Sequence, residues 1–158
     1  MKKVLLTLMV FSGISLFPSG SIAQTSTTAD EIIALAKAQW AAEISDPNSV
    51  EEQFKNTADD YTEFNSDYST RLEGKALAMR LSAATAKDPG RMMAGEMLNP
   101  KVQMYGDVAI LSYNFAGVTK NKDGEMKSIR AKSTRVYAKI AGKWKLVHAN
   151  FGMDPMPK

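Results

Sequence analysis

The stretch TRVYAKIAGKWKLVHANFG at residues 134–152 contributes most to the fold assignment. Apolar and polar residues alternate along it in two runs that meet at Ala141-Gly142. Alternation with a period of two is typical of β-strands, and a short break containing glycine is typical of the turn between antiparallel strands. The stretch therefore predicts a β-hairpin at the end of the domain. It also holds the only histidine of the chain, His148.

The period of two extends back from this hairpin to Arg91. Turn signals such as Asn99-Pro100 and Gly106-Asp107 interrupt it. A series of consecutive strands joined by short turns predicts an antiparallel meander. We expect its strands over 91–98, 101–105, 108–119, 125–140 and 144–151.

Before Arg91 the apolar residues recur with helical spacing instead. Capping-box sequences at 28–31 and 49–52 predict the starts of a first helix, ending near Asp46-Pro47, and of a shorter second helix. Gly74 precedes a third helix, and a brief strand is expected at 61–64. Helices that precede a meander predict an α+β domain, with the helices packed on one face of a curved sheet.

The N-terminus has the layout of a secretory signal peptide. Two lysines precede an apolar run over 4–17, and small residues lead up to Gln24. The run is too short to span a bilayer, which takes about 20 apolar residues. We therefore expect a periplasmic or secreted protein with no membrane anchor after cleavage. The expected parts are a signal peptide over 1–23, one domain over 24–152 and a loose tail over 153–158.

The composition excludes several kinds of site. Cysteine is absent, which excludes a thiol nucleophile and thiolate zinc sites, and a lone histidine predicts no transition-metal site. The sequence has no glycine-rich phosphate loop and no dinucleotide fingerprint, and we expect no cofactor and no nucleic-acid partner. Residues 24–75 carry 11 acidic and 4 basic side chains, whereas residues 120–145 carry 9 basic and 2 acidic ones. This asymmetry predicts either two solvated faces of opposite charge or an anion-attracting sheet surface.

Five segments together resemble a known superfamily. They are DEIIALA at 30–36, YTEFNSD at 61–67, LEGKAL at 72–77, LNPKVQMYGD at 98–107 and TRVYAKIAGKWKLVHANFG at 134–152. Their order resembles the nuclear transport factor 2-like (SnoaL-like) superfamily, and most closely the association domain of calcium/calmodulin-dependent protein kinase II and its bacterial relatives. The resemblance implies a cone-shaped domain of three N-terminal helices on a curved, mainly antiparallel sheet, with a pocket at its open end. No kinase motif is present, so the resemblance implies no phosphoryl transfer.

The resemblance also implies candidate pocket residues. His148 and Asn150 occupy positions where the association domain has two histidines, and Arg135 matches an arginine in a TRV motif. A buried arginine is costly unless it is paired with a carboxylate, which a bound ligand or an internal Asp or Glu would provide. We favour the internal partner. The other candidate ligand-binding residues are Tyr113, whose face depends on the register of its strand, Tyr137, Asn65 and Trp40.

Alternation along the last strand places His148 and Asn150 on one face, together with Trp144 and Leu146. It places Val147, Ala149 and Phe151 on the other. The second face would meet solvent, because the helices cover only one side of the sheet. Its apolar residues predict that a second copy of the chain covers it. We therefore expect a homodimer, with a higher oligomer as the alternative.

Asn65 argues against one reaction. By resemblance, the corresponding position in ketosteroid isomerases holds the aspartate that moves the proton, and an amide cannot act as a base. Asp60, Glu63 and Asp67 lie nearby in the sequence, but Glu63 and Asp67 would need a shifted register to replace it.

Two functions stay open on this basis. The preferred one is an exported, self-associating domain that binds a small organic ligand of anionic character. The alternative is a small isomerase, cyclase or hydratase that uses His148 as acid or base, together with Tyr113 or Asp60. Asn65 and the missing second histidine favour the first.

Overall fold

The computed structural model of the protein describes residues 21–86 and 91–154, and side chains from residue 27 onward. Residues 1–20 of the expected signal peptide lie outside this part, as do residues 155–158 of the expected tail. Within it, three helices and six strands form the expected α+β fold. The elements are α1 (Ser21–Ser45), α2 (Val50–Phe54), β1 (Thr57–Phe64), β2 (Leu72–Glu73), α3 (Lys75–Thr85), β3 (Arg91–Tyr105), β4 (Val108–Lys120), β5 (Met126–Ile140) and β6 (Lys143–Met153).

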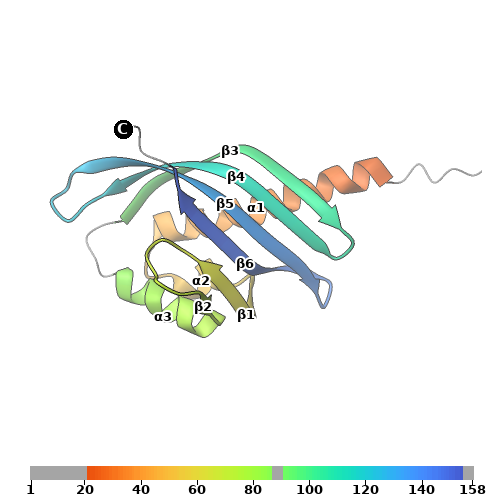
Figure 1. Cartoon of the computed structure of the whole chain (residues 1–158), viewed down its shortest axis with the longest axis horizontal. Coiled ribbons are helices and arrows are strands. Elements are labelled where there is room, and N and C mark those ends of the chain that lie inside the picture. The colour runs from red at the N-terminus through yellow and green to blue at the C-terminus, as the bar shows by residue number, and fades with distance from the viewer. Residues whose placement is uncertain (1–20, 87–90, 155–158) are drawn as a thin grey trace, which may run out of the picture.

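One curved, unclosed sheet organises the molecule, with its strands in the order β2-β1-β6-β5-β4-β3 (Figure 1). The four long strands form an antiparallel meander as expected, but the two strands expected over 91–98 and 101–105 are one strand, β3, with an irregularity between Leu98 and Lys101. Strand β1 joins the edge of the meander parallel to β6. Helix α1 packs across β3 and β4, while α3 packs beside β1 and β2. We call the face toward the helices the concave face and the opposite one the convex face. No helix in the described part combines the length and apolarity needed to cross a membrane.

The boundaries differ from expectation at several places. Helix α1 begins at Ser21, so the expected capping box at 28–31 lies inside the helix. The second capping box is not formed either, because Ser49 Oγ donates to the carbonyl oxygen of Asp46 at 2.6 Å. Strand β1 begins at Thr57, earlier than expected. Met153 closes β6, so the expected loose tail does not begin at residue 153.

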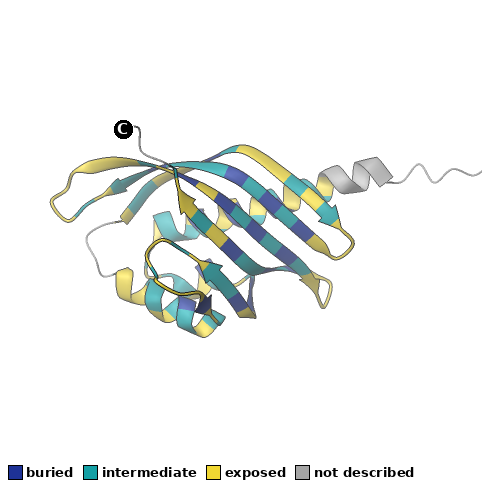
Figure 2. Cartoon of the chain, viewed as in Figure 1, coloured by how far each residue is buried: buried dark blue, intermediate teal, exposed yellow. Residues whose placement is uncertain are grey.

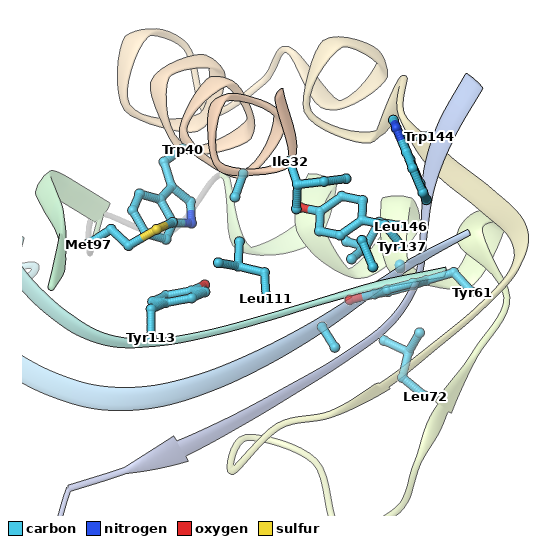
Figure 3. Packing of buried hydrophobic residues seen from close by; sticks show 14 residues of the cluster. Ile32, Trp40, Tyr61, Leu72, Met97, Leu111, Tyr113, Tyr137, Trp144 and Leu146 are labelled. Carbon is cyan, nitrogen blue, oxygen red and sulfur yellow. The ribbon is translucent and has the colours of Figure 1, made fainter. Parts of the chain in front are cut away.

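The core lies between α1 and the concave face. Burial alternates along the central strands, which produces the dark stripes across the sheet in Figure 2. Ile32 and Trp40 project from α1 toward Leu111, Tyr113 and Tyr137 on the sheet (Figure 3). Transfer of such apolar area out of water is the main stabilising contribution to a chain without disulfides.

A β-bulge interrupts the pairing of β6 with β5. Tyr137 pairs with Leu146, but the preceding residue of β5, Val136, pairs with His148. Val147 is therefore the extra residue of the bulge. Because side chains alternate with a period of two, one inserted residue exchanges the two faces for every position beyond it.

The bulge changes which side chains of β6 face the helices. Trp144 and Leu146, before the bulge, lie on the concave face, as do Ala149 and Phe151 after it. The expectation that His148 shares a face with Trp144 and Leu146 is therefore wrong. Phe151 points toward the helices rather than toward a partner molecule.

Two paired glycines make room for an aromatic side chain of the concave face. Gly95 of β3 pairs with Gly117 of β4, and the ring of Phe115 lies over both of them. A Cβ atom on Gly117 would lie 2.6 Å from two ring carbons of Phe115 and 3.1 Å from the carbonyl oxygen of Ala94. The Phe115 ring in turn packs edge-on against Trp40, with ring centres 5.2 Å apart.

We expect Gly117→Ala to lower the free energy of unfolding by about 1–3 kcal/mol, because the new methyl group displaces Phe115 from a filled space. Gly152→Ala is the matched control, since nothing lies within 4 Å of a Cβ atom there. Chemical denaturation of both variants measures the difference. Equal stability of the two variants would contradict this account of Phe115.

Candidate functional site

A cavity of about 430 Å³ opens between the helices and the concave face. Its size lies within the range of small-molecule sites. Helices α1 and α3 and strands β1, β4, β5 and β6 all contribute to its lining. The aromatic members of the lining are Trp40, Phe54, Tyr61, Tyr68, Tyr113, Phe115 and Phe151.

Arg135 of β5 lines this cavity with only 3% of its surface exposed. Its Nε donates to the hydroxyl of Tyr113 at 2.9 Å, and its Nη1 donates to Oε1 of Gln39. The guanidinium carbon lies 5.8 Å from the ring centre of Trp40 and 5.5 Å from that of Phe151. Uncharged groups and aromatic rings thus replace the water that Arg135 has lost.

Arg135 has no carboxylate in ion-pair contact within the described part of the chain. The ion pairs found there are Lys55–Glu52, Arg71–Glu73 and Lys132–Asp154. Burial acts to lower the pKa of Arg135, but its interactions with Tyr113 and Tyr137 act in the opposite direction, and the net shift of the pKa is upward. Arg135 is therefore a buried cation, and the expectation of an internal Asp or Glu partner is wrong for the described residues.

A carboxylate, Glu63 of β1, also faces the cavity. The hydroxyl of Tyr61 donates to its Oε2 at 2.6 Å, and Nδ2 of Asn65 donates to its Oε1 at 3.0 Å. Burial raises the pKa of Tyr61 and the charge of Glu63 raises it further, whereas Arg135 lowers it. The pKa of Tyr61 therefore depends on the negative charge of Glu63 and on the positive charge of Arg135.

Glu43 of α1 completes the charged lining together with Asp67. Burial raises the pKa of the Glu43 carboxyl, and the positive charge of Arg135 opposes that effect. Loss of hydration therefore outweighs the attraction to Arg135 in its effect on the pKa of Glu43.

Four of the predicted site residues do line the cavity. They are Arg135, Tyr113, Trp40 and Asn65. Tyr137 faces the same side of the sheet, but it is 2% exposed and lies in the core beneath α1, outside this cavity. Tyr113 faces inward, in the register that brings its hydroxyl to Arg135.

His148 and Asn150 lie on the convex face, on the other side of the sheet from the cavity. Nδ1 of His148 lies 2.9 Å from Oγ1 of Thr62, and its ring meets that of Phe64 edge-on at 5.9 Å. Acid–base catalysis by His148 with Tyr113 would need both groups at one substrate. The sheet separates them, and Asp60, the other suggested partner, is exposed on β1.

The cavity residues that sequence reasoning did not assign include Glu63, Glu43, Gln39 and Phe151. Glu63 precedes Asn65 by two positions at the end of β1, and continued alternation places both side chains on one face without a shifted register. Gln39 and Glu43 are four residues apart in α1, and side chains at that spacing lie on the same face of a helix. Phe151 could not be assigned, because its orientation depends on the bulge in β6.

Solved structures of similar fold include two association domains. That of the C. elegans kinase has 20% sequence identity, with 83% of this chain and 96% of that chain covered and a TM-score of 0.60. The hub homology domain from Chlamydomonas reinhardtii has 23% identity, with 81% and 98% covered and a TM-score of 0.66. A nuclear transport factor 2-like protein of unknown function from Pseudomonas putida has 18% identity, with 84% and 98% covered and a TM-score of 0.69. These likenesses show the fold.

The sequence comparisons identify a family, whereas the structural likenesses show only the fold. No curated protein matches the chain. The model of one family, described as the calcium/calmodulin dependent protein kinase II association domain, matches residues 29–152. That match spans all of the elements that form the cavity, and the chain therefore belongs to this association-domain family, with a nuclear transport factor 2-like fold.

Proposed function

We propose that this protein is an exported, self-associating domain whose cavity binds a small organic anion, with a carboxylate of the ligand at Arg135. The observation that carries the proposal is a cation that is 3% exposed and has only uncharged hydrogen-bond partners at the cavity wall. A guanidinium group binds a carboxylate through paired N–H donors, and the low polarity around Arg135 strengthens such a bond.

The remaining lining suits an organic ligand rather than an inorganic ion. Aromatic rings surround the guanidinium group, and Trp40 packs edge-on against Tyr113 at 5.5 Å. Rigid aromatic walls offer apolar contact area to a planar or alicyclic ligand body. The ligand class that fits is a small aromatic or alicyclic carboxylate.

Self-association is proposed through the convex face. Its centre is formed by two rows of directly paired residues, and none of them is an acid, a lysine or an arginine. The rows are Ile110, Val136, His148 and Thr62, and Ser112, Thr134, Asn150 and Phe64.

Charged side chains occur where these rows reach the edge strands. Lys101 of β3 pairs with Ser112, and Glu73 of β2 pairs with Thr62. An uncharged centre with a charged rim is the composition of protein–protein interfaces. A sheet face that meets an identical face forms a closed two-fold dimer. His148 would then lie at the interface between two copies rather than at a substrate.

Ligand binding is tested with para-methylbenzoate as the probe and isothermal titration calorimetry as the measurement. We expect Arg135→Met to weaken binding by about tenfold or more, since a charge-assisted hydrogen bond is lost. Arg130→Met removes an exposed arginine of the same strand and should bind as the wild type does. Equal affinity of the two variants would refute the assignment of Arg135.

Self-association is tested by light scattering at micromolar concentration. We expect the wild type to have the mass of a dimer and Val136→Glu to have that of a monomer, because a carboxylate at the centre of the interface loses its hydration without a partner. Met126→Glu is the control, since Met126 is 58% exposed at the end of β5. A monomeric wild type, or a Val136→Glu variant that keeps the wild-type mass, would reject the interface.

Export is tested at the N-terminus. We expect the protein recovered from the producing cell to begin at Gln24, because signal peptidases cleave after small residues such as those at 21 and 23. N-terminal sequencing measures this directly. An intact Met1 on protein from the cytoplasm would rule out export.

A further inference from the structure

Glu63 and Arg135 lie in one row across the sheet. Glu63 pairs with Ala149 of β6, and Ala149 pairs with Arg135. Two strand spacings of about 4.8 Å place their Cα atoms roughly 10 Å apart. At this row β6 contributes only the fully buried methyl group of Ala149, and the two charged side chains line the same cavity.

Each of these charged groups is held by its own neighbours. Glu63 accepts hydrogen bonds from the side chains two residues before and after it, at 2.6 and 3.0 Å. Arg135 donates to Tyr113 and Gln39. Among the residues that the structure describes, no ion pair joins Glu63 to Arg135. The cavity therefore presents a carboxylate and a guanidinium group that are anchored apart.

The charges of the lining do not balance. Three carboxyl groups, those of Glu43, Glu63 and Asp67, accompany the single guanidinium group of Arg135. Burial raises the pKa of Glu43, but even if Glu43 is left out of the count, the carboxyl groups of Glu63 and Asp67 outnumber the guanidinium group of Arg135. A ligand with a carboxylate alone would add another negative charge to this cavity and would be repelled by Glu63. A cationic group on the same ligand removes that repulsion.

We infer that the ligand is a zwitterion, a small amino-acid-like molecule whose carboxylate binds Arg135 and whose ammonium group binds Glu63. This inference rests on the proposed carboxylate site and adds the second anchor. The aromatic walls hold the body of the ligand between the two charged ends. Such a ligand neutralises both anchored charges at once, which a simple carboxylate or a simple amine does not.

Three probes of the same shape separate the two anchors: para-(aminomethyl)benzoate, para-methylbenzoate and para-methylbenzylamine. We expect the zwitterion to bind the wild type at least about tenfold more tightly than the carboxylate, the gain typical of one charged hydrogen bond. Glu63→Gln should abolish this preference by weakening the zwitterion, and it should bind para-methylbenzoate at least as tightly as the wild type does, because a repelling carboxylate is gone. Arg135→Met should weaken both carboxylates. Titration calorimetry measures all of these affinities.

Glu96→Gln is the matched control, because Glu96 is exposed on β3, outside the cavity lining, and the substitution makes the same change of charge. Melting curves verify that each variant is folded. If para-methylbenzoate binds the wild type as tightly as the zwitterion, or if Glu63→Gln keeps the preference, the zwitterion proposal fails and the carboxylate site survives. If neither carboxylate binds, or if Arg135→Met binds both normally, the carboxylate site itself fails.

Discussion

Burial of the guanidinium group of Arg135 constrains every element around it. A charge that has lost its water requires hydrogen-bond acceptors or polarisable surfaces in fixed positions. Helix α1 provides Gln39 and Trp40, β4 provides Tyr113, and β6 provides Phe151. The contacts of Arg135 therefore tie α1 to three strands of the sheet, and two of them are made by aromatic rings of the cavity lining.

The β-bulge in β6 lets one short strand contribute to two different surfaces. Before the bulge, Trp144 and Leu146 belong to the core, and after it Ala149 and Phe151 continue the concave face. Without the extra residue, His148 and Asn150 would face the cavity, and Phe151 would face solvent. The bulge thus places an aromatic side chain at the cavity wall and turns the one histidine of the chain away from it, which favours binding over acid–base chemistry at this position.

Much of the fold could be predicted from the sequence, because period and turn residues report local structure directly. The helix after Gly74 and the meander after Arg91 are examples, although the turn expected at Asn99-Pro100 is an irregularity inside the single strand β3. An inserted residue, in contrast, cannot be recognised from composition or turn signals, because a bulge leaves both unchanged. It nevertheless exchanges the two faces for every later position of the strand. That is why Arg135, Trp40 and Asn65 line the cavity as expected, whereas the faces expected for His148, Asn150 and Phe151 were wrong. The face of Tyr113 depended on a register that the sequence left open, and Tyr137 lies in the core outside the cavity. The partner of Arg135 was mispredicted for another reason: sequence reveals which groups are charged, but not that tyrosine and glutamine can hold an arginine in place.

The fold alone does not determine the chemistry of this cavity, because the same architecture occurs in proteins whose similarity to this chain extends to the fold only. What distinguishes this chain is the placement of charge. The guanidinium group of Arg135 and the carboxylate of Glu63 are anchored by separate neutral partners, and no ion pair joins them. Keeping opposite charges apart in a space of low polarity costs stability, since a direct ion pair would be lower in energy. A folded protein tolerates such a cost mainly at sites where another molecule completes the pairing.

The centre of the convex face, by contrast, lacks charged residues altogether. The two faces of the sheet therefore suit different occupants: a charged small molecule on the concave side and an uncharged protein surface on the convex side.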